Sequence, residues 1–147
     1  MDNALAAELP GGAPDRPDGS GGASVHSVFS VFSRNCPSRG TLEHMTGRWG
    51  ALTLTALHEG SLRFNELRRR VDGVSEKMLS QTLHALERDG LVHREAQPVN
   101  PPRVDYELTP LGRAAAGQLL VLIRLLEGRM PEVLSARERY DERHGRP

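Results

Sequence analysis

The segment Arg63–Leu108 constrains the fold of this 147-residue chain most strongly, because two short helical patterns meet there at a turn. The first pattern stops at Asp72-Gly73, and the second begins after Ser75, whose hydroxyl can accept an unpaired backbone N–H, and stops at Gly90. The apolar side chains of the first helix are Phe64, Leu67 and Val71, and those of the second are Leu79, Leu83 and Leu86. Two short helices joined by so tight a turn predict a helix-turn-helix.

Two strand-like runs follow the second helix, at Val92–Gln97 and Arg103–Leu108. Three prolines between them would keep the connecting loop out of any strand ladder, which suits an exposed hairpin. A helix-turn-helix followed by a β-hairpin is a winged helix, whose second helix fits the major groove of DNA. The predicted class is therefore mainly α (α+β), a winged helix-turn-helix with a two-stranded β-wing.

The flanking segments divide the chain into three parts. We expect a disordered leader over residues 1–33, whose apolar stretch Val25–Phe32 could dock on the body, a winged-helix DNA-binding domain over 34–109, and C-terminal helices over 110–144. Short helices are predicted at Thr41–Met45 and on the apolar face of Trp49, Leu52, Ala56 and Leu57. The helix Pro110–Gly128 is apolar around most of its circumference, so packing of one face alone would leave apolar side chains in water. Pro131 should end this helix.

Composition excludes several classes of protein. No apolar run approaches the ~20 residues of a membrane-spanning helix, and the N-terminus has no basic stretch followed by an apolar one, so we expect no signal peptide and no membrane partner. A single cysteine fits a reducing cytoplasm. The six histidines show no metal-ligand spacing, and no nucleotide-binding or hydrolase motif occurs, so we expect neither a metal, nor a cofactor, nor an enzyme.

The polar side chains of the second helix are the candidate base readers. Net charge is zero over the whole chain, so affinity for DNA would need a local basic patch. Opposite the leucine stripe, one face carries side chains that can bond to base edges or phosphates: Lys77, Ser80, Gln81 and His84. Ser75 and the helix N-terminus could bind phosphate, as could Arg63, while Arg103 beside the wing loop could reach a phosphate or the minor groove.

Cys36 is a candidate redox sensor. It precedes Pro37 at the junction of leader and body, where exposure is plausible, and Arg34 and Arg39 would favour its thiolate. In a dimer, two copies could oxidise to an intersubunit disulfide. The alternative is that a lone cysteine is only a small buried apolar residue.

Several motifs together carry a family resemblance: Cys36-Pro37, Gly47-Arg48-Trp49, the run from Arg63 to Val92, and the run from Pro101 to Arg113. With these motifs the chain resembles the HxlR family of winged-helix transcriptional regulators, related in architecture to the MarR group. The resemblance implies a homodimer that is held together by N- and C-terminal helices and is more often a repressor than an activator. It also implies, in some members, sensing of quinones, aldehydes or disulfide stress at the cysteine that corresponds to Cys36.

The sequence thus predicts a cytoplasmic homodimer that binds double-stranded DNA at an inverted-repeat operator, with an electrophile or another small molecule as inducer. Two alternatives stay open. A winged helix can serve as a protein-interaction module, and the zero net charge leaves room for that. The regulator could also sense a small molecule without thiol chemistry, in a dimer cavity lined by the apolar C-terminal helix.

Overall fold

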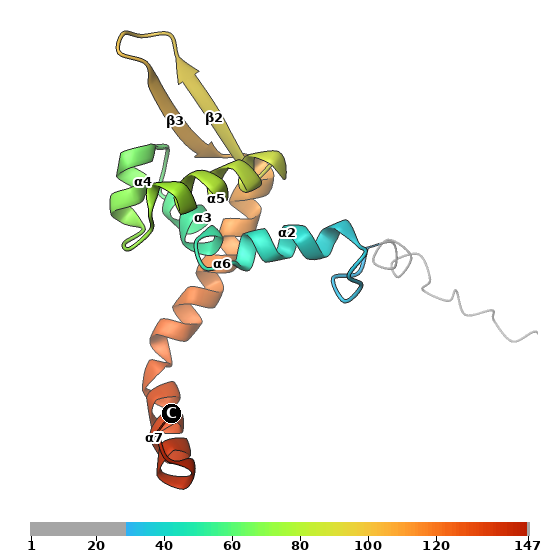
Figure 1. The fold of residues 1–147 in the computed structure, drawn as a ribbon, viewed down its shortest axis with the longest axis vertical. Helices are drawn as coiled ribbons and strands as arrows, with labels where there is room; N and C mark the ends of the chain where they lie inside the picture. The colour runs from blue at the N-terminus through green and yellow to red at the C-terminus, as the bar shows by residue number, and fades with distance from the viewer. Residues whose placement is uncertain (1–28, 147) are drawn as a thin grey trace, which may run out of the picture.

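The computed structural model describes residues 29–146, which form a helical body, a protruding β-hairpin and two helical extensions (Figure 1). The elements in chain order are α2 (Pro37–Thr46), α3 (Gly50–His58), β1 (Leu62–Arg63), α4 (Phe64–Arg70), α5 (Glu76–Arg88), β2 (Val92–Gln97), β3 (Arg103–Leu108), α6 (Pro110–Gly128) and α7 (Met130–His144). The winged helix-turn-helix predicted from the sequence is confirmed. Predictions that concern residues 1–28 lie outside the described residues.

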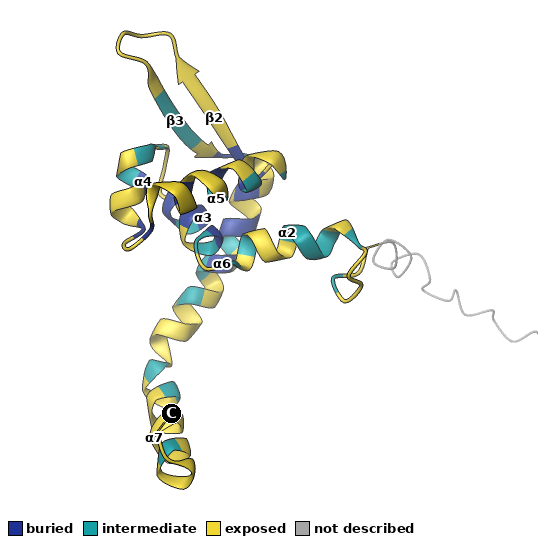
Figure 2. Ribbon diagram, viewed as in Figure 1, coloured by how far each residue is buried: buried dark blue, intermediate teal, exposed yellow. Residues whose placement is uncertain are grey.

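The core lies where α3, α4, α5 and the start of α6 meet. The largest fully buried side chains are six leucines and one threonine: Leu54, Leu57, Leu67, Leu79, Leu86, Leu91 and Thr53. The leucine stripe of α5 faces this core, as its spacing predicts, and Trp49 packs partly buried against it. The core therefore fixes the orientation of α5, whose other side remains free (Figure 2).

The sheet has one strand more than the sequence predicts. The wing strands β2 and β3 pair antiparallel from Val92–Leu108 at the base to Gln97–Arg103 at the tip, where the proline loop begins. The short strand β1 also pairs with β3, with Leu62 opposite Tyr106. The wing is thus a hairpin whose base is joined to the helix-turn-helix by a third strand.

Three local expectations need correction. Helix α2 begins at Pro37 rather than near Thr41, because proline suits the first turn of a helix and Cys36 precedes it in extended backbone. Leu52 is exposed, and Leu54 is buried in its place, so the apolar face of α3 is rotated from the predicted one. Within the stretch 25–32, Phe29 and Phe32 are 61% and 90% exposed, so these two side chains do not dock on the body.

Thr109 fixes α6 to the end of α5. Its hydroxyl donates to the carbonyl of Gly90 at 2.6 Å and accepts from the backbone N–H of Gly112 at 3.0 Å. A Cβ at Gly112 would lie 1.9 Å from the Leu91 carbonyl oxygen, so only glycine allows this approach. The start of α6 is therefore held against the turn between α5 and β2.

The rest of α6 leaves the body together with α7, and α2 points away in another direction (Figure 1). Along α6, the buried residues end at Leu119, and the apolar side chains beyond it are mostly exposed. The helix ends at Gly128, as the sequence predicts, and α7 begins at Met130 with Pro131 in its first turn. None of the described helices is long and apolar enough to cross a membrane.

Candidate nucleic-acid interface

Helix α5 presents one polar face to solvent. The Ser75 hydroxyl accepts the backbone N–H of Met78 at 3.1 Å, which is the N-cap expected from the sequence. Leu79, Leu83 and Leu86 are buried, and the four predicted reading residues all lie on the exposed side: Lys77, Ser80, Gln81 and His84. The geometry therefore brings these four side chains together on one free helix face.

The arginines around α4 differ in how they are held. Arg63 is the N-cap of α4, and its Nε lies 3.7 Å from the Glu66 carboxylate. Arg70 donates to Glu59 at 2.7 Å, and this hydrogen bond and ion pair lower the pKa of Glu59 and raise that of Arg70. Arg68 Nη1 donates a hydrogen bond to Glu76 Oε1 at 3.0 Å, which links α4 to the first turn of α5. Such exposed arginine–glutamate ion pairs contribute little free energy, so a DNA phosphate can replace the glutamate as the partner of the arginine.

On the wing, Arg103 lies at the end of the strand ladder next to the loop. Its Nε donates to Asp105 Oδ1 at 3.1 Å, and Gln97 Nε2 lies 3.5 Å from the other carboxylate oxygen. Asp105 therefore orients Arg103. The sequence pattern singled out Arg103 as a candidate DNA contact but did not single out Asp105. In the alternating run Val104-Asp105-Tyr106, the pattern alone predicts only that Asp105 is a solvent-facing strand residue.

Cys36 lies away from the reading face, at the N-terminal end of α2. Its sulfur is 3.1 Å from the Ser38 hydroxyl and accepts the backbone N–H of Ser30 at 3.3 Å. Hydrogen bonds from the side chain and backbone of Ser38, and from the backbone of Ser30, lower the pKa of the Cys36 thiol. The residue is partly exposed, so it is not a buried core cysteine. Over residues 29–146, no cluster of three histidine, cysteine or acidic side chains could hold a metal ion.

Comparison with known proteins gives a consistent result. A family model described as HxlR-like helix-turn-helix matches residues 44–133. The HTH-type transcriptional regulator YtfH of Escherichia coli strain K12 is 51% identical over 109 residues, which cover 74% of this chain and 86% of that protein. The solved structure of the transcriptional regulator ytfH from Salmonella typhimurium is 49% identical, with a TM-score of 0.71 over 75% of this chain and 98% of the other.

A further similar structure is the redox regulator HypR in its oxidised form, with a TM-score of 0.58 and 36% identity over 63% of this chain and 96% of the other. The chain is thus a DNA-binding transcriptional regulator, and its relatives are not enzymes. Because the family model spans more than half of the sequence and covers α3 to α6 together with the wing, the chain belongs to the HxlR-like helix-turn-helix family.

Proposed function

We propose that this protein is a homodimeric, sequence-specific repressor that places α5 of each subunit in the major groove of an inverted-repeat operator. The observation that carries the proposal is the exposed face of α5, where Lys77, Ser80, Gln81 and His84 lie opposite the buried leucines. Such side chains can bond to adenine and guanine edges, and the capped helix start can bind phosphate. Arg63 and Arg103 would contact the DNA backbone on either side.

The apolar surface of α6 supports the proposed dimer. Val121, Leu122, Leu125 and Leu126 are between 51% and 62% exposed, on a helix that extends beyond the body. A contiguous apolar patch of this kind on a soluble protein marks a protein–protein contact. A second copy of the chain offers the same patch, so a two-fold pairing would cover both. The two copies of α5 would then read half-sites about one helical turn of DNA apart.

The sign and place of action are part of the same proposal. A dimer that occupies an operator can block the transcription machinery, and we therefore assign it the role of a repressor. We place it in the cytoplasm, where a reducing environment would keep Cys36 a thiol until an oxidant arrives.

In-vitro selection of bound DNA, with the full chain both reduced and oxidised, tests the proposal directly. We expect the reduced protein to enrich one inverted repeat, and its affinity to fall steeply with salt because several phosphates are neutralised. Enrichment of no sequence, together with a shallow salt dependence, would instead favour a winged helix that binds protein.

Replacing Gln81 by alanine should weaken discrimination between operator and random DNA by ~1–3 kcal/mol, because a bidentate contact to a base would be lost. Non-specific affinity should hardly change. Competitive gel shifts measure both quantities. The matched control is Gln118→Ala on the exposed surface of α6, which should leave discrimination unaltered. Equal discrimination by the Gln81 variant and the wild type would remove Gln81 from the reading residues.

We further propose that Cys36 makes DNA binding sensitive to oxidants. Its lowered pKa favours the thiolate, and its place at the N-terminal end of α2 leaves it accessible to a second chain. With diamide, two thiols would each lose a proton and together give two electrons to the N=N bond, forming an intersubunit disulfide and a hydrazine. The names of similar structures support this idea, since they include an oxidised redox regulator, HypR, and a diamide-treated protein, YodB, from B. subtilis.

Cys36→Ser should preserve operator binding and abolish its response to diamide. Gel shifts before and after treatment measure the response, and non-reducing electrophoresis shows whether a linked dimer forms. Ser38→Ala is the companion variant, because it removes one hydrogen bond to the sulfur and should slow the reaction. If wild-type protein ignores diamide, or the serine variant still responds, Cys36 is not the sensor.

A further inference from the structure

An aromatic ring, and not a carboxylate, holds the side chain of Arg48 in place. Four arginines of the helix-turn-helix and its sheet each lie beside a carboxylate oxygen: Arg63, Arg68, Arg70 and Arg103. The guanidinium carbon of Arg48 instead lies 4.7 Å from the centroid of the Trp49 ring, and no ion pair involves Arg48 among residues 29–146. The positive charge of Arg48 is therefore positioned without being neutralised.

The contact with the ring leaves the N–H donors of Arg48 available for another partner. Within the part of the chain that the structure describes, its guanidinium donates no hydrogen bond to the protein. A guanidinium group carries five N–H donors in a fixed fork, and a phosphate can accept two of them at once. An arginine that already rests on an aromatic ring also has less conformational freedom to lose when it binds.

The Trp49 ring is a fixed platform for this arginine. It packs partly buried against the core, and its edge lies near the turn of the helix-turn-helix, since a Cβ added at Gly73 would be 3.9 Å from Trp49 Cη2. The backbone beside the ring is also constrained, because a Cβ at Gly50 would collide with the His44 carbonyl oxygen at the turn from α2 into α3. Arg48 is thus carried by a tightly packed corner of the fold.

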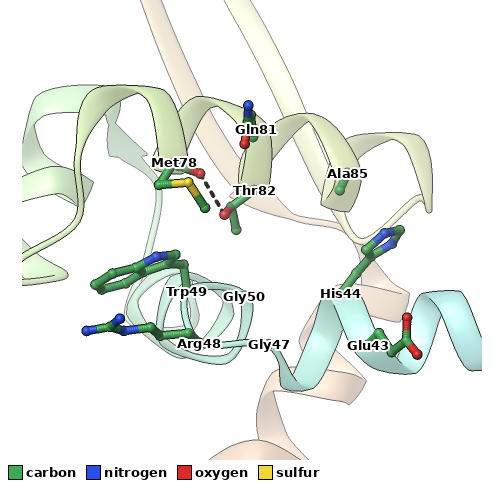
Figure 3. Close-up of a pocket in the computed structure, with 10 residues that line it drawn as sticks. All are labelled: Glu43, His44, Gly47, Arg48, Trp49, Gly50, Met78, Gln81, Thr82 and Ala85. Atoms are coloured by element: carbon green, nitrogen blue, oxygen red, sulfur yellow. Dashed lines mark hydrogen bonds between the residues drawn. The ribbon is translucent and has the colours of Figure 1, made fainter.

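Arg48 lies beside the face of α5 that we assign to base reading. A cavity of about 620 Å³ separates α5 from the corner where α2 meets α3, and its lining includes residues from both sides: Arg48, Trp49, Met78 and Gln81. Figure 3 shows Arg48 on the side of the Trp49 ring away from α5. An α-helix with its side chains is about 10–12 Å across and the major groove is about 12 Å wide, so groups that flank a helix in the groove meet the sugar-phosphate backbone.

From this arrangement we propose that Arg48 of each subunit binds a DNA phosphate at the edge of the major groove that receives α5, and that Trp49 positions it there. The inference rests on the proposed placement of α5 in the groove. A contact to the backbone adds affinity for any sequence and leaves the choice of bases to α5. It also supplies positive charge beside the reading helix in a chain whose net charge is zero.

Replacing Arg48 by methionine tests the phosphate contact. Fluorescence anisotropy of labelled operator and random duplexes, measured with the full chain over a range of KCl concentrations, gives the affinity and its salt dependence. We expect the variant to bind both duplexes about tenfold more weakly or worse. The slope of log K against log[KCl] should become shallower by about 0.9 for each lost contact, or roughly 1.8 for a dimer. Arg139→Met on exposed α7 is the matched control and should change neither quantity.

Two further variants separate the charge from its platform. Arg48→Lys keeps the charge and should restore most of the slope, although a single ammonium gives a weaker contact than the arginine fork. Trp49→Leu should lower the DNA affinity of the wild type but have little further effect in the Arg48→Met background, because nothing is then left to position. Circular dichroism checks the folding of each variant. Arg48 is exposed, so its variants should fold even if the Trp49 variant does not.

An Arg48→Met variant with the wild-type salt slope overturns the phosphate contact, since a merely structural change would lower affinity without changing the slope. Additive losses from Arg48→Met and Trp49→Leu overturn the positioning role of the ring. Random DNA is sufficient to measure the slope. Failure of base reading by α5 would therefore appear as a separate result, in which the wild type binds operator and random DNA equally while the effect of Arg48 on the slope remains.

Discussion

Replacing Leu122 and Leu125 together by glutamate should turn the proposed dimer into a monomer and reduce operator affinity about 10²–10⁴-fold. Both side chains are more than half exposed on the same side of α6, where they are spaced three residues apart. Two charges buried against the partner's apolar surface would cost more than the pairing returns. In a dimer, binding of one half-site makes contact with the second half-site intramolecular, and a monomer loses this advantage. Linking two binding modules typically raises affinity by about 10²–10⁴-fold.

Light scattering during size-exclusion chromatography gives the mass, and gel shifts give the affinity. The matched control carries Arg113→Glu and Gln118→Glu, two acidic changes at exposed polar positions of the same helix, and should remain dimeric. The monomer should keep the helix content of the wild type and its weak binding to a single half-site. A glutamate variant that stays dimeric, or a monomer that binds the full operator normally, would contradict the assigned role of α6.

The helices were predictable where local rules agree with packing. In α5, the cap at Ser75 and the leucine spacing point to the same start and the same buried face, and the structure has both. The wing ends where prolines prevent further pairing, and α6 begins where proline follows a capping threonine. These features depend on residues close together in the chain, which is why the sequence alone sufficed.

Other features depend on contacts that no local pattern encodes. Strand β1 has only two residues, too few for a visible alternation, and exists because β3 returns alongside it. On α3, Leu52 and Leu54 are equally apolar, and the packing of α3 among its neighbouring elements decides which of them is buried. The same holds for the candidate site. The partner of Arg103 and the cavity beside Trp49 arise from residues that are brought together by folding.

Leu86→Ala should lower the free energy of unfolding by about 2–5 kcal/mol, the range for removing a fully buried leucine from a packed core. Leu86 is completely buried on α5, and its carbonyl also accepts the backbone N–H of Leu91 at the turn into the wing. The resulting cavity would loosen α5 against the core, so operator affinity should fall although no DNA contact is removed.

Urea denaturation at a fixed protomer concentration measures this stability, because a dimer's stability depends on concentration. The control is the next residue, Glu87→Ala, which is exposed on the same helix and should stay within about 0.5 kcal/mol of the wild type. If the two variants were equally stable, the leucine stripe could not be what holds α5 with its polar face outward. The orientation on which DNA reading depends would then need another cause.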